Sequence, residues 1–192
     1  MARRALLVLD LINELVHPDG QYSHVCLAHA TSRATLARAA VAIERARAAD
    51  VPVIFVVLAF SQHYEDWPSR STLFGPADPQ HRFAAGSWGT QVHALLTPEP
   101  GEDIVYKRRI SPFYATPLDL LLRERGIDTL LLAGVATDLV VLSTARDAHD
   151  RGFAVEVLED ATATEDQDLQ EAALTLLDRT ATVTCVDKAL PA

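Results

Sequence analysis

The sequence predicts an α/β fold, in which helices cover both faces of a doubly wound, mostly parallel sheet of six strands. Short, continuous apolar runs recur along the chain, as in strands that are buried on both faces. Longer segments with helical periodicity alternate with these runs, which is typical of a parallel sheet with crossover helices. No internal repeat or linker interrupts this order, so we expect one domain over residues 1–192.

Two strands and one long helix are predicted in the first part of the chain. Residues 4–10 form an apolar run that ends in a carboxylate, Asp10, and we interpret the run as the first strand. The sequence HPDG at residues 17–20 is a turn signal. Residues 31–50 are rich in alanine and periodic, which predicts a helix, and residues 51–58 form a second strand buried on both faces.

Residues 59–101 have no regular pattern but contain both tryptophans, Trp67 and Trp88. A long irregular stretch in a compact domain is usually functional. We expect it to cover the active site and to contribute to a subunit contact. Its histidines, His63, His81 and His93, lack a recognisable ligand spacing, so we predict no metal site.

The second half alternates strands and helices. A strand over residues 103–106 is followed directly by Lys107, and Thr116-Pro117 is a strong helix start that leads to a helix ending at Gly126. The remaining predicted elements are a strand at 130–133, a helix to Arg151 capped by Thr137 or Asp138, a strand at 154–158, a helix from Thr164 or Asp166 to about Arg179, and a strand at 182–186.

Charge and composition exclude several function classes. The formal net charge of −9 would repel phosphates, which argues against nucleic-acid and anionic-membrane partners. The two cysteines, Cys26 and Cys185, do not suggest a disulfide framework. No signal peptide or long apolar span is recognisable, so we expect a cytoplasmic location.

Three strand ends carry the residues that could support chemistry. Asp10 ends the first strand, Lys107 ends the third, and the turn at residues 134–138 follows the fourth, so all three should meet at the carboxyl edge of the sheet. Read from the residues alone, Asp10 is equally well a loop aspartate, and an Asp–Lys pair is more often structural than catalytic. Val140 falls in the first turn of the following helix, where a nucleophile would be activated, but valine can neither attack nor carry a proton.

Several stretches resemble, in order, the isochorismatase-like hydrolase superfamily, which includes isochorismatases, nicotinamidases and N-carbamoyl amidohydrolases. The resemblance spans nearly the whole chain and rests on six stretches: LLVLDLINEL with Asp10, GSWGTQVHALLTPEPGEDIVYKRRISPF with Lys107, TPLDLLLRERGIDTLLLAG, GVATDLVVLSTARDAHDRG, the DATA segment at residues 160–163 and the closing helix. It implies a six-stranded parallel sheet, no cofactor, and a homodimer or higher oligomer.

The resemblance also assigns roles to residues. In the thiol hydrolases of the family, residues matching Asp10 and Lys107 activate a cysteine, whose place in this sequence is taken by Val140. Cys26 and Cys185 belong to other segments. A cis peptide, here Val135–Ala136, helps to hold the oxyanion. In the isochorismatase branch, the aspartate instead protonates a vinyl ether without a thiol, although Ala136 replaces the tyrosine typical of that branch.

We therefore predict a hydrolase or lyase without metal or cofactor, with Asp10 as general acid/base and Lys107 as its electrostatic partner. Trp88, Phe113 and Val140 are the candidate pocket wall, with ordinary core packing as the alternative. A small substrate, for example a cyclic carboxylic acid, would bind near Arg108 or Arg109. Two alternatives concern the whole protein: a non-catalytic relative that binds a ligand or partner, and a substitution introduced at the nucleophile position.

Overall fold

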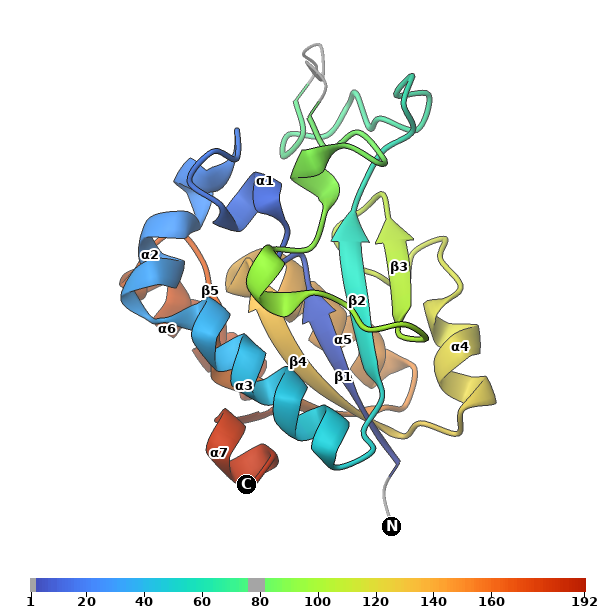
Figure 1. Cartoon of the computed structure of the whole chain (residues 1–192), viewed down its shortest axis with the longest axis vertical. Coiled ribbons are helices and arrows are strands. Elements are labelled where there is room, and N and C mark those ends of the chain that lie inside the picture. Colours follow the sequence, from blue (N-terminus) through green and yellow to red (C-terminus); the bar gives the residue numbers. More distant parts are fainter. Residues whose placement is uncertain (1–2, 76–81) are drawn as a thin grey trace.

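The computed structural model describes residues 3–75 and 82–192, and its centre is an all-parallel six-stranded sheet in the order β3-β2-β1-β4-β5-β6 (Figure 1). The predicted sheet is thus confirmed. The strands are β1 (Arg4–Leu9), β2 (Val53–Leu58), β3 (Asp103–Lys107), β4 (Thr129–Val135), β5 (Ala154–Ala163) and β6 (Thr182–Thr184).

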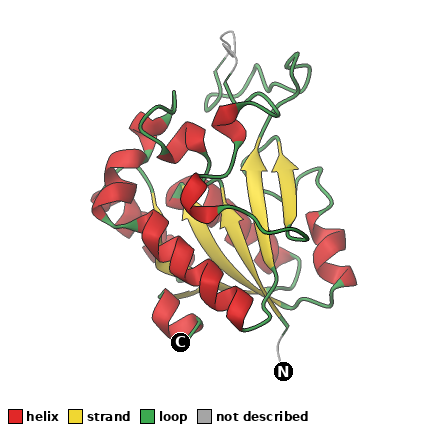
Figure 2. Ribbon diagram, in the orientation of Figure 1, coloured by secondary structure: helices red, strands yellow, loops and turns green. Residues whose placement is uncertain are grey.

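Helices cover both faces of the sheet (Figure 2). On one face, α3 (Thr35–Ala48) and α7 (Val186–Ala189) pack against alternate strand residues such as Leu6 and Val8. On the other face, α4 (Leu118–Glu124), α5 (Leu142–Asp150) and α6 (Gln167–Leu177) pack with residues such as Leu7 and Leu9. Because successive side chains of a strand point to opposite faces, the continuous apolar runs fill both cores.

Several element boundaries differ from the prediction. The helix expected over residues 31–50 is two helices, α2 (Leu27–Ser32) and α3, separated at Ala34, whose φ of 54° is left-handed and ends helical hydrogen bonding. A short helix, α1 (Asn13–Val16), follows β1 and was not predicted. The last strand stops at Thr184, and the chain turns into α7, where Val186 N donates to the Asp160 carboxylate at 2.9 Å.

The stretch at residues 59–101 is irregular, as predicted, in its described part. It contains the short 3₁₀ turns η2 (Trp88–Thr90) and η3 (Ala94–Leu96), and a further 3₁₀ turn, η1 (Ser23–Val25), lies before α2. Phe60, Trp67 and Phe74 pack edge-on to one another with ring centroids 4.8 to 5.7 Å apart. His81 lies outside the described residues.

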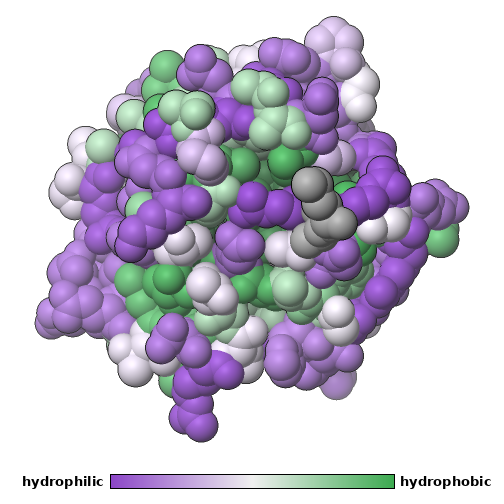
Figure 3. All heavy atoms as spheres, turned by 90° about the horizontal axis from the view of Figure 1, so that it is seen from below, coloured by the Kyte–Doolittle hydropathy of each residue, from purple (hydrophilic) through white to green (hydrophobic). Residues whose placement is uncertain are grey.

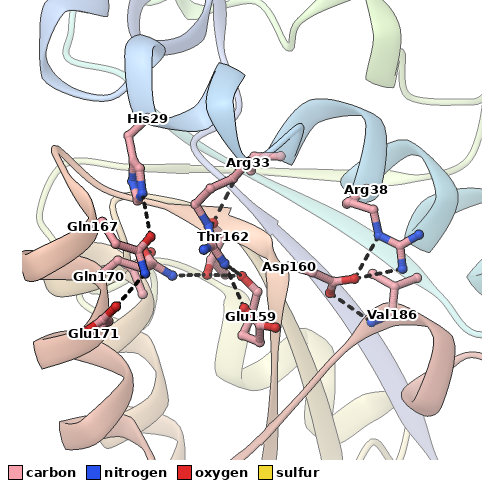
Figure 4. Close-up of polar contacts among 12 residues, drawn as sticks. His29, Arg33, Arg38, Glu159, Asp160, Thr162, Gln167, Gln170, Glu171 and Val186 are labelled. Atoms are coloured by element: carbon pink, nitrogen blue, oxygen red, sulfur yellow. Dashed lines mark hydrogen bonds and ion pairs between the residues drawn. The ribbon is translucent and has the colours of Figure 1, made fainter.

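A row of arginines ties α2 and α3 to the C-terminal half of the chain (Figure 4). Arg33, at the end of α2, pairs with Glu159 at 2.7 Å, and Arg38 of α3 pairs with Asp160 at 2.7 Å. Arg38 and Arg45 both also reach Asp187. These pairs are partly exposed, so they fix the position of the helices more than they stabilise the fold.

The amino ends of the strands lie at the lower end of the molecule as drawn in Figure 1, near both termini. Seen from below, this end has a mainly hydrophilic rim around a more hydrophobic centre (Figure 3). Within the described ranges, the structure contains no helix long and apolar enough to cross a membrane.

Candidate active site

A buried ion pair lies at the carboxyl edge of the sheet. Lys107 Nζ is 2.7 Å from Asp10 Oδ2, and each side chain is only 1% exposed. The other carboxylate oxygen of Asp10 accepts a hydrogen bond from Leu58 N at 2.8 Å, and Lys107 Nζ also donates to Arg109 O at 3.2 Å. Three neighbouring strands therefore supply the pair and its support, and the predicted convergence of Asp10 and Lys107 is confirmed.

The environment of Asp10 favours its neutral form more than water does. Burial raises the pKa of Asp10 above its ordinary value of 3.8, while the charge of Lys107 and the hydrogen bonds from Lys107 and Leu58 act in the lowering direction. The backbone of Asp10 is left-handed, with φ of 52°, a conformation that residues other than glycine adopt rarely and mainly at special sites. A carboxyl group with a raised pKa can serve as a proton donor closer to neutral pH.

The turn after β4 is the second part of the site. Gly134, the second-last residue of β4, leads into this turn, and a Cβ atom there would lie 2.0 Å from Leu9 O, so only glycine allows β4 to approach β1 this closely. The Val135–Ala136 peptide bond is cis, as the resemblance implied. Residues Thr137–Val141 then form a π-type turn, in which Val140 N and Val141 N both donate to Ala136 O.

A chain of buried polar groups lies behind this turn, partly shown in Figure 4. Thr137 Oγ1 donates to Gln170 Oε1 at 2.7 Å, and Gln170 Nε2 donates to Thr162 Oγ1 at 3.0 Å. Asp138 accepts a hydrogen bond from Thr164 Oγ1. The prediction that Thr137 or Asp138 caps the helix is therefore wrong, because both side chains are used in these contacts with α6 and the end of β5.

An apolar cavity of about 200 Å³ opens beside the ion pair. Val135, Ala136 and Val140 line it together with Asp10 and Lys107. The rest of its wall is mainly aliphatic and aromatic: Leu15, Tyr22, Val25, Cys26, Leu58, Trp67, Leu73, Phe74, Phe83, Ile110 and Leu139. Trp67 and Phe74 belong to the irregular stretch, which therefore covers the candidate site as predicted.

Cys26 lines this cavity, although sequence position separates it from the other site residues. It lies just before α2, and no motif pointed to it. Burial, together with the nearby charges of Asp138, Asp10 and Glu165, raises the pKa of its thiol to about 12. The thiolate, which is the reactive form, is therefore almost absent at neutral pH.

Three predicted pocket residues lie elsewhere. Phe113 is buried in the core on the α4–α5 face, with its ring 6.1 Å from that of Phe153. Trp88 lines a separate groove near β3 and is 46% exposed. Arg108 does not line the cavity and pairs with Asp66. The positions of Asp10 and Lys107 at strand ends could be predicted from the sequence. The directions of the loop side chains, such as Trp88 and Arg108, depend on tertiary contacts and could not.

Among the described residues, no group of three or more histidine, cysteine or acidic side chains is arranged to hold a metal ion. His17 and His93 lie close together, with ring centroids 5.8 Å apart, but each Nδ1 accepts a backbone hydrogen bond, from Asp19 N and Leu95 N respectively. The Nδ1 atoms of both rings are therefore used as hydrogen-bond acceptors within local turns.

Comparisons with known proteins agree with this arrangement. The isochorismatase domain family matches residues 4–188 of the chain. The ureidoacrylate amidohydrolase RutB of Methylobacterium radiotolerans is 35% identical over 169 residues, which cover 82% of this chain but only 66% of that relative.

Solved structures of similar proteins cover almost the whole chain. The isochorismatase-like hydrolase from Alkaliphilus metalliredigens has a TM-score of 0.81 at 30% identity, covering 98% of this chain and 94% of its own. N-carbamoylsarcosine amidase from Thermoplasma acidophilum has a TM-score of 0.73 at 30% identity, covering 97% and 98%. The family match at residues 4–188 includes all six strands and the turn after β4.

Proposed function

The chain belongs to the isochorismatase family, and from this premise we propose that it is a hydrolase or lyase that acts on a small metabolite by acid–base chemistry at Asp10, without a thiol nucleophile. The observation that carries the proposal is the ion pair of Asp10 and Lys107, which is 2.7 Å long and lines an apolar cavity. Removing two charges from water to bury this pair costs free energy. Apolar side chains of similar size at the same positions would stabilise the fold about as well or better. A role in proton transfer accounts for its presence.

The chemistry follows from the two states of the carboxyl group. Protonated Asp10 gives its proton to the substrate, for instance to the double-bond carbon of a vinyl ether, which leaves an oxocarbenium-like centre. Water adds to that centre and gives one proton back to the Asp10 carboxylate, which forms a hemiketal. The ether C–O bond of the hemiketal then breaks, the hydroxyl proton passes to the leaving oxygen, and a carbonyl compound and an alcohol are released. Lys107 stabilises the carboxylate that Asp10 becomes, because the two charges are in contact in a region of low dielectric.

Covalent catalysis is the route used by the family's thiol hydrolases, and relatives of this chain bear the names of amidohydrolases. We interpret Val140 as standing at the position of their nucleophile. It lines the cavity but offers no reactive atom. Cys26 lines the cavity too, but its thiol, with a pKa of about 12, is a poor source of thiolate. Amide hydrolysis through a thioester is therefore not the proposed reaction.

The size and the apolar wall of the cavity limit which substrates can bind. Its volume of about 200 Å³ admits only a small group, and its mainly apolar wall fits a hydrocarbon ring or an unsaturated chain. A small carboxylate metabolite, including a cyclic one, is our proposed substrate class. Backbone amides near the Val135–Ala136 peptide are the candidates for holding an oxyanion.

A second candidate function is a ligand-binding protein without catalysis. Two features favour it. An apolar cavity can bind a ligand without converting it, and the valine at position 140 adds no reactive group to the cavity wall. We also propose that the chain forms a homodimer or higher oligomer, supported by exposed apolar side chains on or beside the edge strand β3: Trp88, Ile104 and Tyr106.

A substrate screen separates the two functions. The full chain is incubated with vinyl ethers, amides and small esters, and products are followed by NMR. Turnover of any class by the wild type supports an enzyme. Binding without turnover across the panel supports the ligand-binding alternative.

A further inference from the structure

A second groove adjoins the apolar cavity. Its volume is about 530 Å³, and it shares two wall residues with the cavity, Phe74 and Ile110. The rest of its wall is more polar: Pro68, Ser71, Arg109, Ser111, Tyr114, Ser143 and Asp147. A ligand that fills the cavity and extends past Phe74 or Ile110 would enter this groove.

We propose that this groove binds the carboxylate end of a two-part ligand, whose apolar end occupies the cavity, and that Arg109 is the residue that recognises the charge. The inference rests on the proposed function and deepens it by dividing its substrate between two subsites. A carboxylate inside the small apolar cavity would lose its hydration and meet the Asp10 carboxylate there. The carboxylate of the substrate is better placed outside the cavity, in the groove, where Arg109 supplies a positive charge.

Arg109 is suited to this role because its position is fixed while its charge has no ion-pair partner among the described residues. Nη1 donates to the backbone oxygens of Asp66 and Arg108, at 3.2 and 2.6 Å, and the guanidinium lies 5.9 Å from the centre of the Tyr114 ring. No carboxylate of residues 3–75 or 82–192 lies within ion-pair distance of it. Its remaining N–H donors form the planar fork that binds a carboxylate through two hydrogen bonds.

The other charged groups near the two spaces are already paired. Asp147, the acidic residue of the groove, accepts from Ser111 Oγ at 2.6 Å and pairs with Arg151 at 2.8 Å. Lys107, the cation of the cavity, is bound to Asp10.

Two further arginines, Arg82 and Arg108, already contact other side chains. Arg82 stacks on the cavity residues Tyr22 and Trp67, and its charge acts on Glu14, whose pKa is raised by burial against the lowering effect of Arg82. Arg108, next in sequence to Arg109, pairs with Asp66 and lines neither space.

This difference between adjacent arginines supplies a matched control. The probes are 3-phenylpropionate and its uncharged amide, which share a phenyl ring for the cavity and differ only in the charged end. Their dissociation constants are measured by calorimetry with the full-length wild type, Arg109→Met, Arg109→Lys and Arg108→Met. Thermal unfolding of each variant confirms that it is folded.

The wild type should bind the carboxylate about tenfold or more tightly than the amide, as expected for charge-assisted hydrogen bonds. Arg109→Met should remove most of this preference, because it should weaken binding of the carboxylate far more than binding of the amide. Arg109→Lys should keep part of the preference, and Arg108→Met should keep all of it. Equal binding of the two probes by the wild type, or equal losses in Arg108→Met and Arg109→Met, would overturn the proposal. Because the assay measures binding, a catalytically inactive protein that still shows the preference would refute only the proposed enzymatic function.

Discussion

Lys107 Nζ lies 2.7 Å from Asp10 Oδ2, and both side chains are almost completely removed from solvent, with an exposed fraction of 1% each. The two residues come from β3 and from the end of β1, and β2 lies between these strands. Leu58 of β2 closes the arrangement by donating its N–H to Asp10. Each charge is therefore held in place by the other, and removal of either leaves a buried charge without its partner.

Lys107→Met should destabilise the protein by about 3–5 kcal/mol at neutral pH, because Asp10 is left buried and unpaired. Burial already raises the pKa of Asp10 above 3.8, so the folded protein holds this proton more tightly than the unfolded chain does. The stability contributed by this tighter binding is fully present below pH 3.8, and it is lost as pH rises through the raised pKa. The loss caused by Lys107→Met should therefore be smaller at about pH 5 than at about pH 7.5, where the folded variant either keeps a proton that the unfolded chain releases or buries an unpaired charge.

Urea unfolding at the two pH values measures this difference. Lys188→Met, which removes an exposed lysine from α7, is the control and should change stability by less than about 0.5 kcal/mol. A Lys107→Met penalty that is equal at both pH values would show that Asp10 does not carry the unpaired charge.

The fold was predictable because its signals are local and redundant. The central strands β1, β2 and β4 each have a continuous apolar run, and Asp166 caps α6 as a candidate N-cap aspartate should, accepting from Leu169 N at 2.9 Å. Asp10 and Lys107 were predictable because strand ends in a parallel sheet share one edge. Cys26 could not be assigned to the cavity, and the choice between Arg108 and Arg109 could not be made, since their positions depend on how α2 and the loop after β3 pack.

Gln170→Leu should destabilise the protein by about 2 kcal/mol, because the buried hydroxyl of Thr137 loses its acceptor and Thr162 loses one of its two hydrogen bonds, keeping the one to Glu159 O. Gln167→Leu is the comparison in the same helix: Gln167 is exposed, and the variant loses only its hydrogen bonds with His29 at 3.3 Å and Glu171 at 2.8 Å, so its change should stay below about 1 kcal/mol. Chemical denaturation of both variants measures the difference. Equal effects would mean that the polar chain behind the turn contributes nothing to its stability.

Self-association should be visible by sedimentation velocity at micromolar concentration. Ile104 and Tyr106 are 39% and 49% exposed on the edge strand β3 and line one groove with Trp88, so an apolar surface lies beside an unpaired strand edge. Tyr106→Lys should shift the protein toward the monomer. Leu120→Lys, at a position on α4 that is 61% exposed and outside this groove, should not. A wild-type protein that sediments as a monomer contradicts the expectation.

Val140→Cys should create a thiol that reacts with iodoacetamide faster than Cys26 does. The new thiol would line the cavity near Lys107, at the start of the helix that leads into α5, where its pKa should fall, whereas the thiol of Cys26 has a pKa of about 12. The near-isosteric change should reduce stability by only about 1 kcal/mol. Mass spectrometry of the alkylated peptides gives the two rates. If the introduced thiol reacts no faster than that of Cys26, the result would argue against a thiol-hydrolase site in this scaffold.

The most direct test of the account is kcat/KM of the wild type and of Asp10→Asn on the best substrate from the screen, measured across pH. The amide of asparagine preserves the shape of the side chain but cannot transfer the proton, so Asp10→Asn should lower kcat/KM by at least about a hundredfold. In the wild type, where Asp10 acts in its protonated form, kcat/KM should fall as pH rises through the raised pKa of Asp10. Equal activity of Asp10→Asn and the wild type would contradict acid–base catalysis by Asp10.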